Sequence, residues 1–369
     1  MISGFATSEG TARYRARFQD KFASDFYRVS RDLYWSSLGL GTYLGNSDSA
    51  TDDLYAQSIQ AAVESGINVL DTAVNYRFQL SERVLGKVLN QLIAAGKIKR
   101  DEVILCSKGG FFPFDGAMPE NPGEWIKTNF IDTKLIRAED VVAGCHSMHP
   151  RYLENQLNQS LKNLGVETLD VYYLHNPETQ LEEVDAKEFK NRVRHAFEFF
   201  ERAIAEGKIR AYGTATWSGY RQPPEAQDYL SLEETVMLAR EVAGPNHHFK
   251  YVQLPFNIAM PEAWIMANQR YGATTLPLLK MAPHLDMTVV ASGSLLQGRL
   301  SKGLPQFVLD HFKDCQTTAQ VNLAFSRSVQ GLTTALVGMK STAHVFENLQ
   351  SGRIKASTEE ELITLFSKK

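Results

Sequence analysis

The sequence predicts an α/β protein built as one closed (β/α)8 barrel, a TIM barrel of eight parallel strands that are each followed by a helix. Short apolar runs alternate with amphipathic, helix-like segments eight times along the chain. These runs are continuously apolar, which is typical of strands buried on both faces. No linker or low-complexity segment divides the 369 residues, which favours one barrel over several domains.

The elements follow in order along the chain. We expect residues 1–25, which are polar and rich in arginine, to form a surface arm. A hairpin at residues 26–37 then opens the barrel domain, residues 26–369. The eight strands are expected at residues 38–43, 67–71, 103–108, 169–175, 211–217, 251–256, 287–291 and 334–337. The helices are expected at residues 51–64, with Thr51 as N-cap, and at 81–95, 151–164, 187–206, 230–243, 273–281, 315–329 and 342–349.

Residues 109–150 interrupt this alternation with several prolines and aromatic residues. Loops after the C-terminal strand ends form the functional mouth of such a barrel, so we expect this insertion to overhang the mouth and influence substrate choice. Its aromatic side chains could line a substrate pocket or form a small core within the loop. They are Phe111, Phe112, Phe114 and Trp125.

Composition limits the other functional classes. Hydrophobic residues make up 43% and charged residues 22% of the chain, and the net charge of −3 favours neither nucleic acid nor an anionic membrane as a partner. Cys106, Cys145 and Cys315 have no paired spacing, which favours a reducing compartment over a disulfide scaffold. Because neither a signal peptide nor a membrane-spanning run is visible, we expect a cytoplasmic protein. The oligomeric state stays open.

Chemistry concentrates at three predicted strand ends. Asp71 closes the second apolar run, and a buried aspartate requires a partner. Lys108 and His175 close the third and fourth runs, so all three should meet at the mouth, with Tyr76 on the loop after Asp71. The pair of Asp71 and Lys108 could also be only a structural salt bridge.

The residues suit protonation of a developing oxyanion. A lysine ammonium ~4 Å away, at an effective dielectric near 20, would lower a tyrosine pKa from about 10 by roughly three units. Tyr76 would then be the general acid, Asp71 would hold Lys108, and His175 would orient a bound carbonyl oxygen. No side chain supplies a hydride, so a cofactor must. A Schiff-base role for Lys108 is an alternative.

The late strand ends offer an anion site. No GxGxxG follows a strand, but Ser292-Gly293-Ser294 and Gly338-Met339-Lys340-Ser341 follow strands seven and eight. Lys340 precedes a helix, and no acid occurs until Glu347, which favours NADPH while leaving NADH acceptable. Cys145, His146 and His149 lack a fourth metal ligand beside them, so we expect no metal site.

Over about residues 26–350 the sequence resembles the aldo-keto reductase family. The resemblance is carried by Leu38-Gly-Leu-Gly-Thr42, Asp71-Thr-Ala-Val-Asn-Tyr76, Lys108, Leu174-His175, Gln253, Gln297-Gly298 and Glu347-Asn348. It implies a catalytic tetrad of Asp71, Tyr76, Lys108 and His175, and NADPH bound extended across the mouth. By position, it implies cofactor contacts from Thr42, Tyr43, Asp71, Thr216, Gln253, Ser294, Leu295, Gly338, Lys340, His344, Glu347 and Asn348.

The implied activity is the reduction of a small aldehyde or ketone to an alcohol, or the reverse. The chain departs from the family pattern in four places. It has Ala215-Thr216 for Ser-Asn, Ser292 for an aromatic residue, Gly293-Ser294 for Ser-Pro, and His344 for arginine or glutamine. Residues 213–218 resemble the channel β-subunits of the family, which implies the alternative of a regulatory subunit that binds NADPH and turns over slowly.

Overall fold

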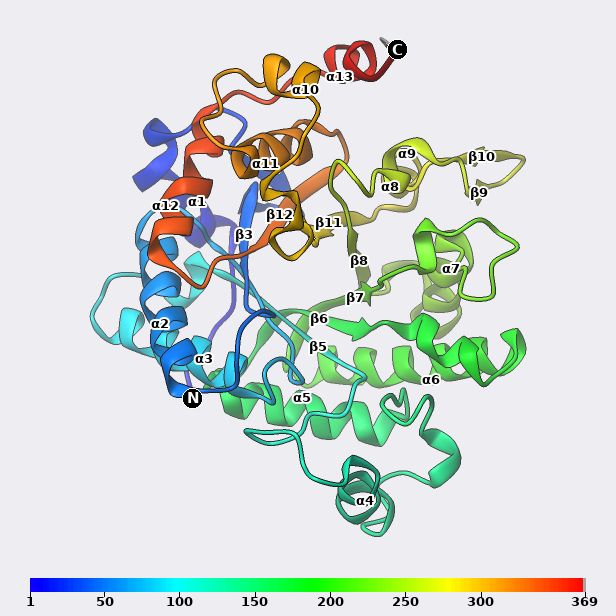
Figure 1. The fold of residues 1–369 in the computed structure, drawn as a ribbon. Coiled ribbons are helices and arrows are strands. Elements are labelled where there is room, and N and C mark those ends of the chain that lie inside the picture. The colour runs from blue at the N-terminus through cyan, green and yellow to red at the C-terminus, as the bar shows by residue number, and fades with distance from the viewer. Residues whose placement is uncertain (368–369) are drawn as a thin grey trace.

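The eight predicted barrel strands are all present in the computed structural model, which describes residues 1–367 (Figure 1). They close a parallel barrel in the order β11-β12-β3-β4-β5-β6-β7-β8. Their bounds are β3 Leu38–Gly41, β4 Val69–Asp71, β5 Ile104–Gly109, β6 Leu169–His175, β7 Ile209–Ala215, β8 Phe249–Pro255, β11 Thr288–Ser292 and β12 Leu332–Gly338. The predicted fold class is therefore confirmed.

Helices surround this barrel (Figure 1). The longer ones that follow strands are α2 Ser49–Glu64, α3 Leu80–Ala94, α5 Pro150–Leu164, α6 Ala186–Ala205, α7 Leu232–Ala243, α11 Thr318–Ser328 and α12 Thr342–Gln350. Asp48, rather than the predicted Thr51, caps α2, because its carboxylate accepts a hydrogen bond from the Thr51 amide at 2.8 Å. Gly165 ends α5 at a φ of 67°, a backbone conformation that favours glycine.

The helix predicted at residues 273–281 is wrong for most of its length. Strands β9 (Gln269–Tyr271) and β10 (Thr274–Leu276) form a hairpin there, flanked by the single turns α8 (Glu262–Ile265) and α9 (Leu278–Met281). Gly272 turns the hairpin at a φ of 58°, and the β-branched Thr274 and Thr275 favour extended backbone. Two short helices near the C-terminus were not predicted, α10 (Gln306–His311) and α13 (Glu359–Ser367).

The expected surface arm instead packs against the N-terminal end of the barrel. Residues 8–18 form α1 (Ser8–Phe18), and Tyr14 is fully buried, with its hydroxyl donating to the main-chain oxygen of Ile67 at 2.9 Å. The arginines that made this segment look exposed also contact the protein, because Arg13 pairs with Asp101 and Arg17 stacks 5.0 Å from the centre of the Tyr14 ring. The predicted hairpin is present as β1 (Tyr27–Ser30) and β2 (Leu33–Ser36).

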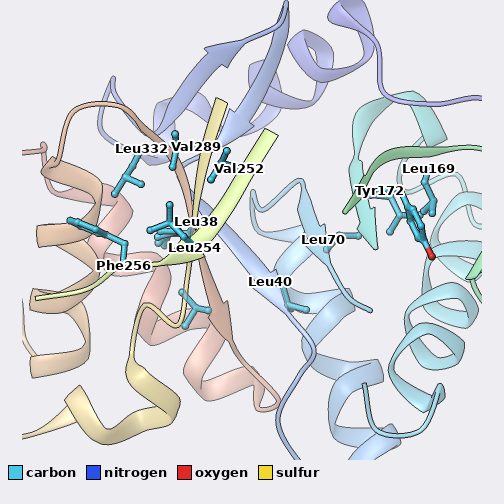
Figure 2. Close-up of a cluster of buried hydrophobic side chains, with 14 of the residues drawn as sticks. Leu38, Leu40, Leu70, Leu169, Tyr172, Val252, Leu254, Phe256, Val289 and Leu332 are labelled. Carbon is cyan, nitrogen blue, oxygen red and sulfur yellow. The ribbon is translucent and has the colours of Figure 1, made fainter. Parts of the chain in front are cut away.

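Alternate residues of the strands point into the barrel or out toward the helices. The outward side chains form a large apolar layer, part of which Figure 2 shows, including Leu38, Leu70, Leu169, Tyr172 and Leu254. The inward side chains form a second cluster that includes Val69, Cys106, Tyr173 and Tyr251. Asp71, Lys108, His175 and Gln253 each follow one of these inward residues by two positions. The strand period therefore sends all four side chains inward at the C-terminal end.

The insertion at residues 109–150 has its own apolar cluster of Phe112, Ile126, Phe130 and Ile136, packed on Tyr152 of α5. Phe114 and Trp125 pack against this cluster. Its short helix α4 (Pro122–Ile126) lies beyond α5, away from the strands (Figure 1). The expectation that the whole insertion overhangs the mouth is wrong, because its apolar side chains bury one another against α5.

Across residues 1–367, no helix has the length and apolar character that would let it cross a membrane.

Candidate active site

A cavity of about 940 Å³ opens where the barrel strands end. The strand ends and the loops that follow them line it, as expected for this fold. Of the four predicted catalytic residues, Asp71, Tyr76 and His175 line the cavity, and Lys108 contacts Asp71 beneath its floor. Every residue predicted to contact the cofactor also lines it: Thr42, Tyr43, Asp71, Thr216, Gln253, Ser294, Leu295, Gly338, Lys340, His344, Glu347 and Asn348.

A buried ion pair forms the floor of the site. Lys108, whose side chain is 1% exposed, donates to the Asp71 carboxylate and to the main-chain oxygen of Thr72 at 2.8 Å. The second Asp71 oxygen accepts from the Gln253 amide at 2.8 Å. Burial raises the pKa of Asp71. Lys108 and Gln253 oppose this effect, but the pKa stays above its ordinary value. Burial also lowers the pKa of Lys108, but Asp71 outweighs this and raises it above the ordinary value.

This pairing affects the alternatives raised for Lys108. A Schiff-base lysine must be a neutral amine when it attacks a carbonyl, whereas the Asp71 carboxylate keeps Lys108 protonated. A structural salt bridge would not need to lie at the active site, whereas Asp71 lines the cavity and Lys108 lies 4.9 Å from the centre of the Tyr76 ring, which also lines it. The arrangement therefore favours an electrostatic role for Lys108.

Tyr76 lies close to both Lys108 and His175. The Lys108 ammonium is 4.9 Å from the centre of the Tyr76 ring, and the centre of the His175 ring is 5.8 Å away. Burial raises the pKa of the Tyr76 hydroxyl, and Lys108 lowers it only in part. The prediction of a tyrosine pKa near neutrality is therefore wrong, because it left out desolvation. The hydroxyl stays protonated at physiological pH and is available to donate a proton.

His175 is a neutral imidazole in this site. Burial, with smaller contributions from Lys108 and His146, lowers the pKa of His175 well below its usual value. Its Nδ1 atom is buried and has no hydrogen-bond partner within residues 1–367. A buried donor without an acceptor is costly, which favours the tautomer with the proton on Nε2. A neutral ring of this kind can donate one hydrogen bond to a bound oxygen.

A hydrogen-bond network that the sequence did not predict anchors His175. The amide nitrogen of Gln180 lies 2.8 Å from Nδ1 of His146, and Nε2 of His146 lies 2.7 Å from the main-chain oxygen of His175. The amide donates to Nδ1, so Nε2 carries the proton and donates to the carbonyl. Arg192 fixes the Gln180 amide by donating to its oxygen at 2.7 Å.

The network also argues against the metal site considered from Cys145, His146 and His149. Both ring nitrogens of His146 are engaged in hydrogen bonds, and burial lowers its pKa to about 4. Among residues 1–367 no group of three or more metal-ligating side chains comes together. Nothing in the sequence pattern distinguished His146 from an ordinary loop histidine.

The insertion aromatics divide between the two roles that were considered. Phe111 lines the cavity, and its ring centre is 5.0 Å from those of both His146 and His175. Phe112, Phe114 and Trp125 belong to the separate apolar cluster over α5. Trp217 lines the cavity as well, is 47% exposed, and donates its main-chain amide to the buried Glu178 carboxylate at 2.6 Å. No sequence pattern indicated that Trp217 is a pocket residue.

At the opposite end of the cavity, Lys340 and His344 lie exposed at the rim. Lys340 precedes α12, whose N-cap residue Ser341 makes no side-chain capping hydrogen bond. The first amides of α12 thus lack a side-chain cap. Elsewhere in the cavity wall, the hydroxyls of Thr216 and Ser294 are buried without a hydrogen-bond partner within the described residues. These donors suit an anionic, extended ligand.

Comparison with known proteins gives matches at the level of sequence and of fold. A sequence model described as "Aldo/keto reductase family" matches residues 37–305. Aldo-keto reductase YhdN of Bacillus subtilis is 29% identical over 50% of this chain and 44% of its own length. A putative voltage-gated potassium channel subunit beta of Schizosaccharomyces pombe is 26% identical over 55% of this chain and 48% of its own. The chain thus spans about half the length of these relatives.

A solved structure shares the fold. The aldo-keto reductase from Klebsiella pneumoniae in complex with NADPH has a TM-score of 0.61 and 22% sequence identity, covering 92% of this chain and 93% of its own. At this identity the likeness shows the barrel architecture alone.

Proposed function

The chain belongs to the aldo/keto reductase family, and we propose that it reduces an aldehyde or ketone to an alcohol with NADPH, or runs the reverse oxidation. Tyr76 is the proposed general acid of this reaction. The observation that carries the proposal is the buried pair of Lys108 and Asp71 beneath Tyr76, with His175 beside it on the cavity wall. A structural salt bridge alone would not require a tyrosine and a neutral histidine at its edge.

The cavity has the donors that a dinucleotide requires. The unpartnered hydroxyls of Thr216 and Ser294 line the cavity, where they would donate to the nicotinamide amide and to the phosphates. Lys340 and the start of α12 lie at one end and would hold the 2′-phosphate of the adenosine. When bound there, NADPH would supply the hydride that no side chain of the site can supply.

The side chains divide the proton chemistry among them. Tyr76 would donate its proton to the carbonyl oxygen as that oxygen gains negative charge. Lys108, which Asp71 keeps charged, would stabilise the tyrosinate that remains. The neutral His175 would donate from Nε2 to the same oxygen and so fix its position. In the reverse direction, the same groups would take the proton from the alcohol.

The substrate end of the cavity is lined by aromatic side chains, namely Tyr43, Phe111 and Trp217. These surfaces suit an apolar or ring-bearing carbonyl compound. Apart from Asp71, the charged residues that line the cavity are Lys340 and Glu347, both in the segment after β12. The substrate itself therefore need not be charged.

A second candidate function is a regulatory subunit that binds NADPH and turns over slowly. The match to a putative channel subunit beta, together with residues 213–218, supports it. The intact set of Asp71, Tyr76, Lys108 and His175 favours the enzyme.

The test uses the purified full chain with NADPH and a panel of aldehydes and ketones. The enzyme is expected to oxidise many equivalents of NADPH per protein molecule, followed as loss of the nicotinamide absorbance. Tight NADPH binding with at most one turnover for every carbonyl would support the regulatory subunit instead.

A further inference from the structure

The three residues after Tyr76 hold a strained backbone conformation. Arg77, Phe78 and Gln79 have φ values of 48°, 54° and 72°, and none of them is glycine. Side chains other than glycine enter this left-handed region rarely, and a run of three persists only where surrounding contacts enforce it. The turn that presents Tyr76 to the cavity is therefore held by other parts of the protein.

The guanidinium of Arg77 supplies one set of these contacts. Its side chain is 1% exposed, and it donates from Nε to the main-chain oxygen of Asn46 at 2.7 Å. Its Nη2 donates to the Asp52 carboxylate at 2.7 Å, and the guanidinium stacks 5.3 Å from the centre of the Tyr55 ring. A buried arginine whose guanidinium bonds two separate groups and stacks on an aromatic ring holds a fixed geometry.

These partners all belong to the loop between β3 and α2 or to α2 itself, and this region forms part of the cavity wall. Tyr43, Leu44, Gly45 and Tyr55 line the cavity, and the Tyr55 hydroxyl donates to the main-chain oxygen of Leu44 at 2.6 Å. Arg77 thus connects the residue next to Tyr76 with the wall against which the cofactor is proposed to bind.

The other end of the turn has its own anchor. The Gln79 amide donates to the main-chain oxygen of Pro113 at 3.2 Å. Phe78, between the two anchors, makes no side-chain hydrogen bond and only packs near Phe114, at 6.3 Å between ring centres. Phe78 shares the strained backbone of Arg77 but not its connection to the cavity wall, and so provides a matched control.

We infer that Arg77 is a positioning residue, whose buried guanidinium fixes the hydroxyl of Tyr76 relative to the bound cofactor by tying the strained turn to the β3–α2 loop. This inference rests on the proposed function, because it needs Tyr76 to be the proton donor. Without the tether, the turn can relax toward ordinary backbone angles and displace Tyr76. Proton transfer depends steeply on such a displacement, whereas binding of the carbonyl compound does not.

The test compares Arg77→Gly with Phe78→Gly. Glycine accepts the left-handed conformation, so both variants relieve strain, but only the first removes the guanidinium. We expect Arg77→Gly to lower kcat about 10- to 100-fold, with a smaller change in KM for the carbonyl compound and in the NADPH Kd measured by fluorescence. Phe78→Gly should retain the wild-type kcat. Equal kcat values in the two variants would overturn the inference.

Chemical rescue distinguishes a specific positioning role of the Arg77 guanidinium from a general structural role of this residue. Guanidinium chloride, titrated at millimolar concentration into Arg77→Gly, should raise kcat in a saturable way. Urea, which has a similar shape but no charge, should not, and guanidinium should not accelerate Phe78→Gly. Rescue by urea to the same extent, or no rescue by guanidinium, would overturn the inference.

If Arg77→Gly does not fold, Arg77→Lys tests the same inference. Lysine keeps the charge but lacks the fork of donors that reaches both Asn46 and Asp52, so kcat should fall severalfold in a variant that still unfolds cooperatively in urea. A wild-type kcat in this variant would contradict the inference. If wild-type protein binds NADPH but reduces no carbonyl, the proposed function fails, which is a different result from an active enzyme that is insensitive to Arg77.

Discussion

The Nε2 atom of His146 lies 2.7 Å from the main-chain oxygen of His175, so one buried histidine anchors the strand end that carries another. The centre of the Phe111 ring lies 5.0 Å from the centre of each imidazole, so Phe111 packs against both histidines. Both histidines are kept neutral by burial. The site therefore depends on two imidazoles that must not take up a proton.

This relationship predicts a loss of stability at mildly acidic pH. Burial lowers the pKa of His146 to about 4, whereas an unfolded histidine has a pKa of about 6.5. Between these values the unfolded chain binds more protons, so the free energy of unfolding falls as the pH falls. From pH 7 to pH 5, His146 alone should remove about 2 kcal/mol, measured by urea unfolding at the two pH values.

The control is His146→Gln, which keeps a donor but cannot titrate. This variant should be less stable at pH 7, and its stability should depend less on pH by about the same 2 kcal/mol. His175 has a lowered pKa too and should account for much of the acid sensitivity that remains. An unchanged pH dependence in the variant would show that His146 is not the titrating group.

Tyr76→Phe should lower kcat for carbonyl reduction by about 10²- to 10⁴-fold, because only the proton donor is removed. Tyr76 lines the cavity beside Lys108, and phenylalanine retains the ring packing against His175. NADPH affinity, measured by fluorescence titration, should remain close to that of wild type. Wild-type turnover in this variant would contradict the role of Tyr76.

Lys108→Met should remove both activity and stability. The Asp71 carboxylate would be left buried with Gln253 but without a cation, a change that typically costs about 3–5 kcal/mol. Unfolding in urea would measure this loss. Adding Asp71→Asn to Lys108→Met removes the unpaired charge and should restore much of the stability but none of the activity. If the double variant is no more stable than the single one, the pair is not the source of the loss.

Phe111 and Trp125 provide a paired test of the insertion. Phe111 lines the cavity, so Phe111→Ala should change the relative kcat/KM values across a panel of aromatic and small aldehydes. Trp125 packs on the separate cluster over α5, so Trp125→Ala should lower stability by about 2 kcal/mol and leave the relative rates unchanged. A substrate shift in the Trp125 variant would mean that the insertion acts on the pocket as a whole.

The sequence predicted the barrel and its strand ends well, because apolar runs of the right length alternate with capped helices. It predicted which side chains meet, since a period of two sends Asp71, Lys108 and His175 inward together. It failed where tertiary contacts decide the outcome. The helicity of residues 8–18 and the burial of Tyr14 depend on the barrel end that they cover.

The sequence also could not predict how burial and nearby charges together shift the pKa values of the site. The predicted low pKa of Tyr76 followed from its distance to Lys108, while the actual direction is set by desolvation in a folded site. The contacts of Arg77 and His146 could not be predicted from the sequence either. Both residues bind main-chain oxygens of segments distant in sequence, Asn46 and His175, which no spacing rule indicates.

The preference for NADPH over NADH depends on Lys340. The 2′-phosphate carries close to two negative charges and needs cations or several donors, whereas sites for NAD typically offer an acid to the ribose. Lys340 lies at the cavity rim just before α12, and the Ser341 side chain does not cap that helix. The ammonium, the first amides of α12 and the helix dipole can therefore act on one phosphate.

The exposure of Lys340 to solvent limits the preference for NADPH over NADH. Lys340 is exposed to solvent, so screening reduces the strength of a charged contact there. His344 also lies at the rim, and its imidazole offers fewer hydrogen-bond donors than a guanidinium would. We expect Lys340→Ala to weaken NADPH binding about tenfold and to leave NADH binding nearly unchanged, both measured by fluorescence titration. The NADPH loss should shrink as salt is raised. If both cofactors weaken equally, or if wild-type protein binds them equally tightly, Lys340 does not hold the 2′-phosphate.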